Sequence, residues 1–313
     1  MLKRFIEVKR ILLTLLLAVS GSSLFAQNYA AQFLDVNPDA RALSLANSAV
    51  VMDASSFAVW NNGAASAFSE RSFSASASYG MWQPSVANAQ VVSAAGFGKL
   101  SEKLTLNAGV KYFMHQSYEV SNSQGIYSGT FTPSEYVASV GAAYKFIPSL
   151  SASVSLNYIG SDLGGPQTAS AFAANLGVMY VNGGLKAGLT ASNIGSSLNY
   201  GGVTSYSLPM HVDLGVGYTI GSVEASRLSV SAQAGMLFAD SSFTAAAALE
   251  YRLKEVFRLA AGYNMCTATG APSFISLGTG VSLFGVSLDL AYLLGTSGTA
   301  ASNTLMLNLG YAF

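Results

Sequence analysis

Histidine, cysteine and serine are the residues in this chain best able to carry catalysis or bind a metal, and their spacing builds no such site. His115 and His211 are the two histidines, and neither belongs to an HxxH or HExxH pattern. Cys266 is the single cysteine, which excludes an intramolecular disulfide and a thiolate metal cluster. Serine is abundant, but no Gly-x-Ser-x-Gly elbow stands at a strand-to-helix turn. We therefore expect no catalysis, no metal and no cofactor.

Charged residues on alternate positions of apolar segments offer a different chemistry, which is ion pairing inside a lumen. In a segment of period two, one parity faces lipid and the other faces inward, where charge is tolerated. Six ionisable residues have the inward parity: Lys111, His211, Asp213, Glu250, Arg258 and Asp289. We expect them to pair with one another and with Asp39, Arg41 or Asp53. A polar permeation or ligand site made from the same groups is the alternative.

The last segment of the chain shows that the segments with this alternating pattern are β-strands. Large apolar residues occupy every second position, and smaller or polar residues lie between them; the large ones are Leu305, Leu307, Leu309, Tyr311 and Phe313. One apolar face and one small or polar face is typical of a transmembrane β-strand. A terminal aromatic residue with a second aromatic two positions earlier resembles the signal read by the bacterial barrel-assembly machinery. These residues therefore predict an outer-membrane β-barrel inserted by that machinery.

Similar segments, separated by turn residues, recur along the chain. They predict about fourteen antiparallel strands, an even number as expected for a single-chain bacterial barrel, although parity alone leaves twelve or sixteen open. The expected spans are 70–80, 88–98, 103–114, 134–146, 149–160, 169–181, 184–194, 207–220, 226–238, 242–252, 256–264, 273–284, 286–295 and 303–313. The connections alternate between short turns such as Asn182–Gly183 and longer loops such as 115–133, which predicts periplasmic turns and external loops.

Composition and the first residues support the same class. Mean hydropathy is +0.40 and 10% of residues are charged, yet no later segment has about 18 uninterrupted apolar residues. Residues 1–26 read as a signal peptide, because four basic residues precede the apolar run 11–19 and small residues lead to Ala26. Removing it leaves 11 basic and 14 acidic residues. No basic tract suggests nucleic acid. We expect an integral protein of the bacterial outer membrane with both termini periplasmic.

Residues 27–69 break the period of two and predict a separate segment before the barrel at 70–313. Asn37-Pro38-Asp39 is typical of a helix start, and apolar residues at three- and four-residue spacing follow as far as Val50, so we expect Pro38–Met52 to be the helical part that plugs the lumen. A turn-rich return contains Trp60, Asn61 and Asn62. The inward positions of the strands are mostly small, so a barrel this wide needs other material in its lumen. We predict a short helical plug that enters from the periplasmic side.

These residues also carry a family resemblance. Phe33-Leu34, Pro38-Asp39-Ala40-Arg41-Ala42 and Trp60-Asn61-Asn62-Gly63-Ala64 resemble the PorV/PorQ family of Bacteroidota, itself similar to the FadL fatty-acid channels. The family usually has Trp-Asn-Pro-Ala where this chain has Trp60 to Ala64, which weakens the transfer of a fatty-acid gating mechanism. The resemblance implies a plugged barrel, embedded in outer-membrane lipid, that serves a larger translocon of the type IX secretion or barrel-assembly type.

Two functions therefore stay open. The first is an accessory or interaction subunit, in which external loops such as 117–133 and 196–205, or a lateral barrel face, dock a larger machine or its cargo. The second is a passive transporter of hydrophobic or small solutes, gated by the plug. An apolar pocket beneath the plug favours transport, whereas a well-packed plug opposes it.

Overall fold

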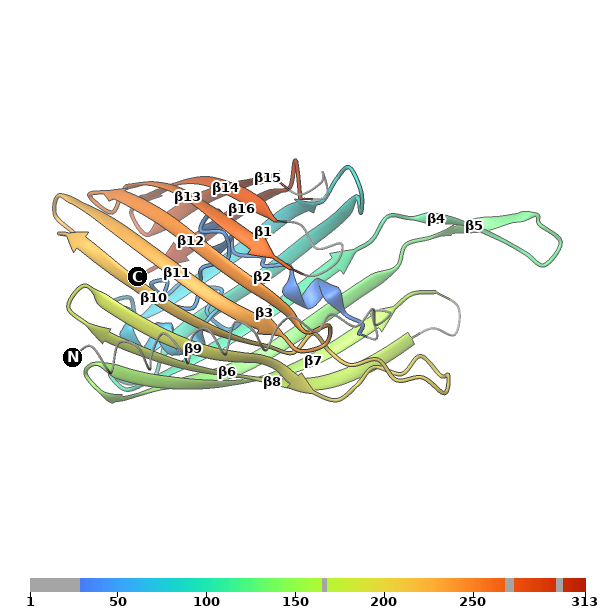
Figure 1. The fold of residues 1–313 in the computed structure, drawn as a ribbon, viewed down its shortest axis with the longest axis horizontal. Helices are drawn as coiled ribbons and strands as arrows, with labels where there is room; N and C mark the ends of the chain where they lie inside the picture. Colours follow the sequence, from blue (N-terminus) through green and yellow to red (C-terminus); the bar gives the residue numbers. More distant parts are fainter. Residues whose placement is uncertain (1–28, 165–167, 268–272, 297–300) are drawn as a thin grey trace, which may run out of the picture.

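The fold is a closed antiparallel β-barrel of fourteen strands (Figure 1). The computed structural model describes residues 29–164, 168–267, 273–296 and 301–313, so the expected signal peptide lies outside the described residues. The barrel strands are β1 (Phe73–Trp82), β2 (Ala89–Lys99), β3 (Leu104–Met114), β6 (Ser134–Ile147), β7 (Leu150–Asp162), β8 (Thr168–Asn182), β9 (Leu185–Gly195), β10 (His211–Gly221), β11 (Ser226–Leu237), β12 (Ser242–Leu253), β13 (Phe257–Cys266), β14 (Phe274–Leu283), β15 (Val286–Gly295) and β16 (Leu305–Ala312).

The barrel closes where β1 pairs with β16. Ser78 lies opposite Asn308 on the inner face, and Tyr79 lies opposite Leu307 on the outer face. The rings of Phe73 and Phe313 stack at 5.4 Å where the seam ends. Each strand alternates buried and exposed positions, as the period of two requires. The predicted all-β barrel with about fourteen strands is therefore confirmed.

Two further strands lie outside the barrel. β4 (Tyr118–Ser121) and β5 (Tyr127–Phe131) form a two-stranded sheet between β3 and β6, and it projects well beyond one opening (Figure 1). The segment 115–133, which contains both strands, is expected from the sequence to be a loop. We call this opening the hairpin end of the barrel, and the opposite opening, where Phe313 lies, the Phe313 end.

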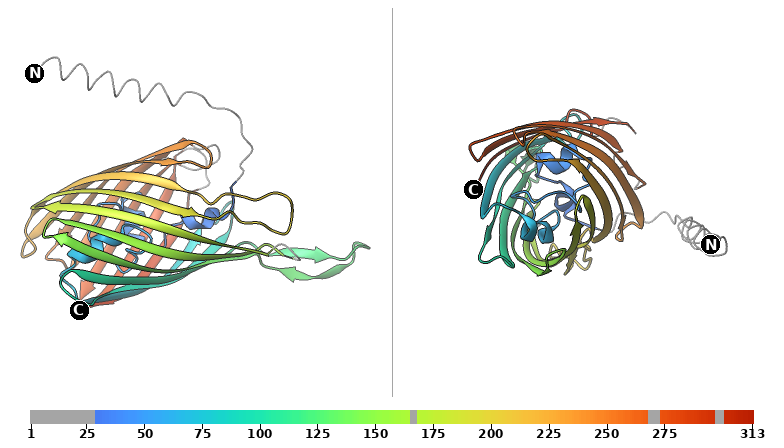
Figure 2. Two further views of the ribbon diagram at one scale, coloured as in Figure 1. Left: turned by 90° about the horizontal axis from the view of Figure 1, so that it is seen from below. Right: turned by 90° about the vertical axis from the view of Figure 1, so that its left-hand side faces the viewer.

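Residues 29–69, called the plug below, lie inside the barrel (Figure 2). They contain the 3-10 helices η1 (Gln32–Asp35) and η2 (Gly63–Phe68) and the α-helix α2 (Ala40–Ser44). The expected helix from Pro38 to Met52 is therefore much shorter than predicted. Ala46 and Asn47 have φ angles of 54° and 62°, and two successive left-handed residues end a right-handed helix. Among the described residues, no helix has the length and apolar character needed to cross a membrane.

The plug runs the length of the lumen. Tyr29 forms a bridge with Ser207, in the connection between β9 and β10 at the hairpin end, and the Ala30 N–H donates to the Ser207 carbonyl. The plug joins β1 at the other end, where the Ser72 N–H donates to the Phe313 carbonyl. We expected the plug to enter from the periplasmic side, with both termini there. This is wrong for the described residues, because Tyr29 and Phe313 lie at opposite openings. Residue parity fixes which face a side chain occupies, but it carries no information on the direction of an irregular segment.

Candidate functional site

The polar groups of the plug and the barrel meet in the lumen, and the centre of this arrangement is the start of α2. The Asp39 carboxylate caps the helix by accepting from the Arg41 N–H at 2.9 Å. Its other oxygen accepts from Ser55 Oγ at 2.5 Å and from Asn61 Nδ2 at 3.0 Å. Asn61 Oδ1 also accepts from Asn37 Nδ2. Two distant parts of the plug are therefore tied to one buried carboxylate.

Arg41 extends from the same helix to the barrel wall. Its Nε and Nη2 donate to the two carboxylate oxygens of Glu250 on β12, at 2.9 and 3.0 Å. The Glu250 side chain is 3% exposed. It also accepts from Arg252 Nε at 2.8 Å, and Arg258 Nη1 lies 3.5 Å away. Such two-bonded pairing fixes the orientation of both planar groups.

Arg258 and Asp289 continue this contact across the neighbouring strands. Arg258 Nη2 donates to Asp289 Oδ1 at 2.8 Å, and its Nη1 donates to Ser44 Oγ at 3.0 Å. Because Ser44 is the last residue of α2, Arg258 holds the end of the helix against β13 and β15.

Asp53 lies where the plug turns back, and three cations surround its carboxylate. Arg41 Nη2 and Arg252 Nη2 are 3.5 and 3.6 Å from Asp53 Oδ2, and Lys186 Nζ contacts Oδ1. Burial favours a higher pKa for Asp53, but Lys186 and Arg41 outweigh it and hold the pKa below its usual value. At Asp39, burial dominates over the Ser55 hydrogen bond and raises the pKa.

Lys111 holds the plug near the hairpin end. Its ammonium, on a side chain that is 2% exposed, donates to three plug carbonyls: Phe33 at 2.9 Å, Leu34 at 3.1 Å and Val36 at 2.8 Å. All three of its donors are therefore used. The ammonium also lies 5.5 Å from the centre of the Phe33 ring.

His211 and Asp213 make a second contact at the hairpin end. His211 Nδ1 is 3.6 Å from Asp35 Oδ1 in the plug, and His211 Nε2 is 3.4 Å from Asp213 Oδ2 on the same strand. Gln233 Nε2 donates to Asp213 Oδ1 at 3.2 Å. The imidazole therefore lies between two carboxylates, one from the wall and one from the plug.

Trp60 and Asn62 join the plug to β6 and β8. Trp60 Nε1 donates to Ser139 Oγ at 2.8 Å. Asn62 caps η2 by accepting from the Ala64 N–H, and its Nδ2 donates to the carbonyls of Val50 and Val178 at 2.8 and 3.2 Å. These contacts attach the plug to the β6–β8 side of the barrel, across the lumen from the Arg41 and Arg258 contacts with β12–β15.

Several partners in these contacts were not among the residues predicted from the sequence. Lys186 and Arg252 both have inward parity, and Arg252 shares its parity with Glu250, so the same rule could have found them. Glu135 also has inward parity, and its carboxylate lies 3.0 Å from His115 Nε2. The five residues proposed as an assembly signal lie along β16 and its end, and four of them are exposed on the outer face: Leu307, Leu309, Tyr311 and Phe313.

Most of these contacts join the plug to the barrel wall. Within the described ranges, no group of three or more His, Cys, Asp or Glu side chains is placed to bind a metal ion. One small polar cavity lies between the plug and strands β3 and β6–β9. Every ionisable residue singled out from the sequence has at least one oppositely charged or hydrogen-bonding partner.

Comparisons with known proteins place this geometry among other barrels. Residues 25–242 match the model of a family described as type IX secretion system protein PorV. The Ralstonia pickettii toluene transporter TbuX superposes with a TM-score of 0.58 at 12% identity, covering 93% of this chain and 100% of that chain. The Pseudomonas putida toluene transporter TodX gives 0.59 at 10% identity, covering 92% and 98%. Identities this low show a shared fold only. No curated protein matches the chain.

Proposed function

Because the chain belongs to the family of the type IX secretion system protein PorV, we propose that it is a non-enzymatic accessory subunit of a larger outer-membrane machine for protein secretion or assembly. The chain is an integral outer-membrane β-barrel. In the proposed orientation, the Phe313 end faces the periplasm and the hairpin end faces the cell exterior. Loop lengths support this orientation, because barrels of this class have short periplasmic turns and longer external loops. At the Phe313 end, β14 and β15 are joined by two residues, whereas β3 and β6 are joined by the whole projecting hairpin.

The observation that carries the proposal is the uneven surface of the β4–β5 hairpin. Tyr118 lies opposite Phe131 and Val120 lies opposite Gly129, so one face is mainly apolar. Glu119 lies opposite Thr130 on the other face. Tyr118 is 46% exposed and Val120 is 38% exposed, and Ile126 and Tyr127 at the tip are about 60% exposed. An isolated two-stranded sheet is marginally stable in water, and an apolar face exposed there is typical of an interaction surface.

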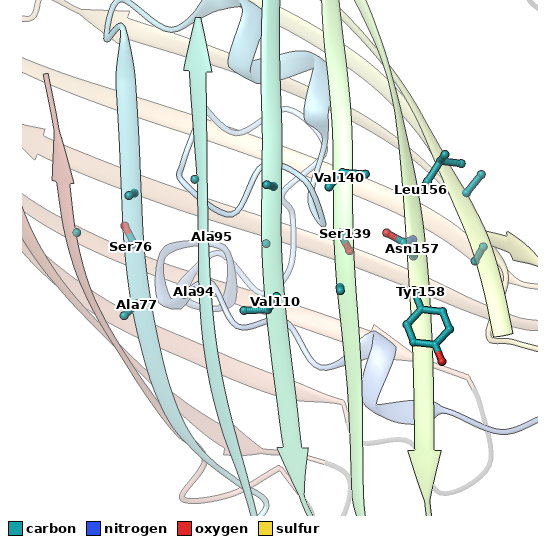
Figure 3. Close-up of a pocket in the computed structure, with 18 of the residues that line it drawn as sticks. Ser76, Ala77, Ala94, Ala95, Val110, Ser139, Val140, Leu156, Asn157 and Tyr158 are labelled. Atoms are coloured by element: carbon teal, nitrogen blue, oxygen red, sulfur yellow. The ribbon is translucent and has the colours of Figure 1, made fainter. Parts of the chain in front are cut away.

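The outer wall beneath the hairpin supports the same reading. A shallow hollow of about 1330 Å³ lies on the outer face of the barrel and extends over β1–β3 and β6–β9 (Figure 3). Its lining combines larger outward residues such as Val140 and Leu156 with small ones on β1, β2, β3 and β6: Ala75, Ala77, Ala94, Gly96, Ala108 and Ala138. Small side chains at a membrane-embedded surface let the backbone of another protein approach closely. The hairpin connects β3 and β6, so the hollow and the hairpin offer one continuous side to a partner barrel.

Passive transport through the lumen has less support. The two transporters that share the fold are described by their substrate, toluene, but nothing in their low identity carries that substrate to this chain. The cavity between plug and wall is small and lined largely by Asn, Ser and Thr, which does not suit an apolar solute. The plug is tied to the wall near both ends of the lumen.

The test is purification of the tagged protein from its own outer membrane in mild detergent, with mass spectrometry of the proteins that accompany it. We expect a much larger barrel or assembly factor in stoichiometric amount. Val120→Lys, on the apolar face of the hairpin, should reduce its recovery at least tenfold. Thr130→Lys is the matched control on the polar face and should leave recovery unchanged. Recovery of wild type as a lone barrel contradicts the accessory role.

A further inference from the structure

A small cavity in the lumen contains polar atoms that no protein group satisfies. It lies between the plug, at Asn61, Asn62 and Gly63, and the inner faces of β3 and β6–β9. Its volume is about 10 Å³, which is the lower limit for holding one water. The wall contributes mostly amide and hydroxyl side chains: Asn107, Ser153, Ser155, Asn175, Thr190 and Ser192.

Two of these lining residues have a buried acceptor without a hydrogen-bond partner in the described part of the chain. Ser155 is 6% exposed, and its hydroxyl has no partner. Asn107 is 4% exposed; its Nδ2 donates to Ser66 Oγ at 3.1 Å, but its Oδ1 has no partner. A buried polar atom left without a hydrogen bond costs roughly 1–3 kcal/mol. Two such atoms lining one cavity therefore indicate a missing hydrogen-bond donor.

The residues that line the cavity also limit which molecule can supply that hydrogen-bond donor. None of the residues that line the cavity is ionisable, so a charged ligand has no counter-charge there. The volume excludes anything much larger than water, and Asn107 Oδ1 requires an occupant that donates. We propose that this cavity is a binding site for ordered water, which bridges strands β3 and β7 beside the plug. This water site does not depend on the docking role proposed above.

The plug also contacts the wall directly on both sides of the lumen. A Cβ atom placed on Gly278 of β14 would lie 2.2 Å from Ser44 Cβ, and one on Gly109 of β3 would lie 2.7 Å from the Trp60 ring. These glycines let the plug approach the wall closely. The water site is therefore a local gap in a contact that is otherwise direct.

Ser155→Ala tests the site, with Ser151→Ala as the matched control. Ser151 lies on the same face of β7, is fully buried, and donates to the Ala64 carbonyl at 2.8 Å. Ser151→Ala loses a satisfied bond and must lower the urea midpoint of the detergent-solubilised barrel. If water is bound, Ser155→Ala lowers the midpoint as well. An unchanged or raised midpoint overturns the proposal, because removing an orphaned hydroxyl relieves its cost.

A crystal structure of the wild-type protein at 2 Å or better gives a direct second measurement. We expect a density peak within hydrogen-bond distance of both Ser155 Oγ and Asn107 Oδ1. An empty cavity at that resolution contradicts the site, whatever the stability of the variants.

Discussion

Arg41 of the plug and Glu250 of β12 form a two-bonded ion pair across 209 residues of sequence, with both N···O distances near 3 Å. The side chains are 12% and 3% exposed. Buried charges of this kind give little net stability when paired, but removing one partner is costly because the other stays buried. The pair therefore acts mainly to fix where the plug lies in the lumen.

The first prediction concerns that pair. Glu250→Gln should destabilise the barrel by roughly 3–5 kcal/mol, because three arginines then lose a carboxylate. Arg41→Met should cost less, since Glu250 keeps Arg252 and Arg258. Urea unfolding in detergent measures both. Arg227→Met is the control and should cost less than either, because the Arg227–Glu255 pair is more exposed, at 21% and 30%, and Glu255 keeps Arg252 as a partner. Equal losses in all three variants would contradict the argument.

The second prediction concerns plug placement. Leu45 is 5% exposed inside the lumen, so a cysteine there should react slowly with a thiol reagent in intact outer membranes. The background is Cys266→Ser, which removes the single native thiol. Glu119→Cys on the hairpin should react at the rate of an exposed thiol. If the two cysteines react equally fast, the plug does not occupy the lumen as described.

Residue parity predicted the strands and the inward positions well, because burial on one face imposes a period of two on every strand. Glu250, Arg258 and Asp289 could be assigned to the lumen in this way. Parity does not say how far along the barrel axis, or where around it, a side chain lies. It therefore could not show that Arg41 pairs with Glu250 and not with Asp213. Lys186 and Arg252 also have inward parity, so the same rule assigns them to the lumen although they were not predicted.

The irregular parts of the chain were harder to predict for a physical reason. The helix ends at Ser44 because Ala46 and Asn47 take left-handed conformations, and Ala gives no local signal for that. The β4–β5 hairpin did have a signal, since Tyr118 to Ser121 alternates and Gly125 sits at the turn with a φ of 79°. The hairpin was missed because it lies outside the barrel and is not needed to close it.

The third prediction concerns Lys111. Lys111→Met removes the donor for three plug carbonyls, and at most water can replace it there. We expect the barrel to fold and η1 to detach, so that a cysteine at Leu34 reacts at least tenfold faster in the variant. Lys145→Met is the control, because Lys145 lies over the Phe68 ring and donates no bond to η1. An unchanged rate at Leu34 would mean that Lys111 does not hold this part of the plug.

The fourth prediction concerns pH. Lys186 and Arg41 hold the pKa of Asp53 below its unfolded value of about 3.9. The stabilisation is therefore present above that value and is lost as pH falls through the lower folded pKa. The Leu45→Cys labelling rate, divided by the rate of Glu119→Cys at the same pH to cancel the loss of thiolate, should rise as pH falls below about 3.9, and Asp53→Asn should remove this part of the rise. Asp39 acts in the opposite direction because burial raises its pKa, so the difference between variant and wild type isolates Asp53.

The last prediction concerns the close contact between α2 and β14. At Gly278, an added Cβ would lie 2.2 Å from Ser44 Cβ and 2.8 Å from the Leu290 carbonyl oxygen. Gly278→Ala should therefore push the helix from the wall and cost about 1–3 kcal/mol in urea unfolding. Gly98→Ala on β2 is the control, since its nearest neighbour is Phe73 Cδ2 at 4.0 Å, and this change should be neutral or slightly stabilising. A Gly278→Ala barrel as stable as wild type would mean that α2 does not press against β14.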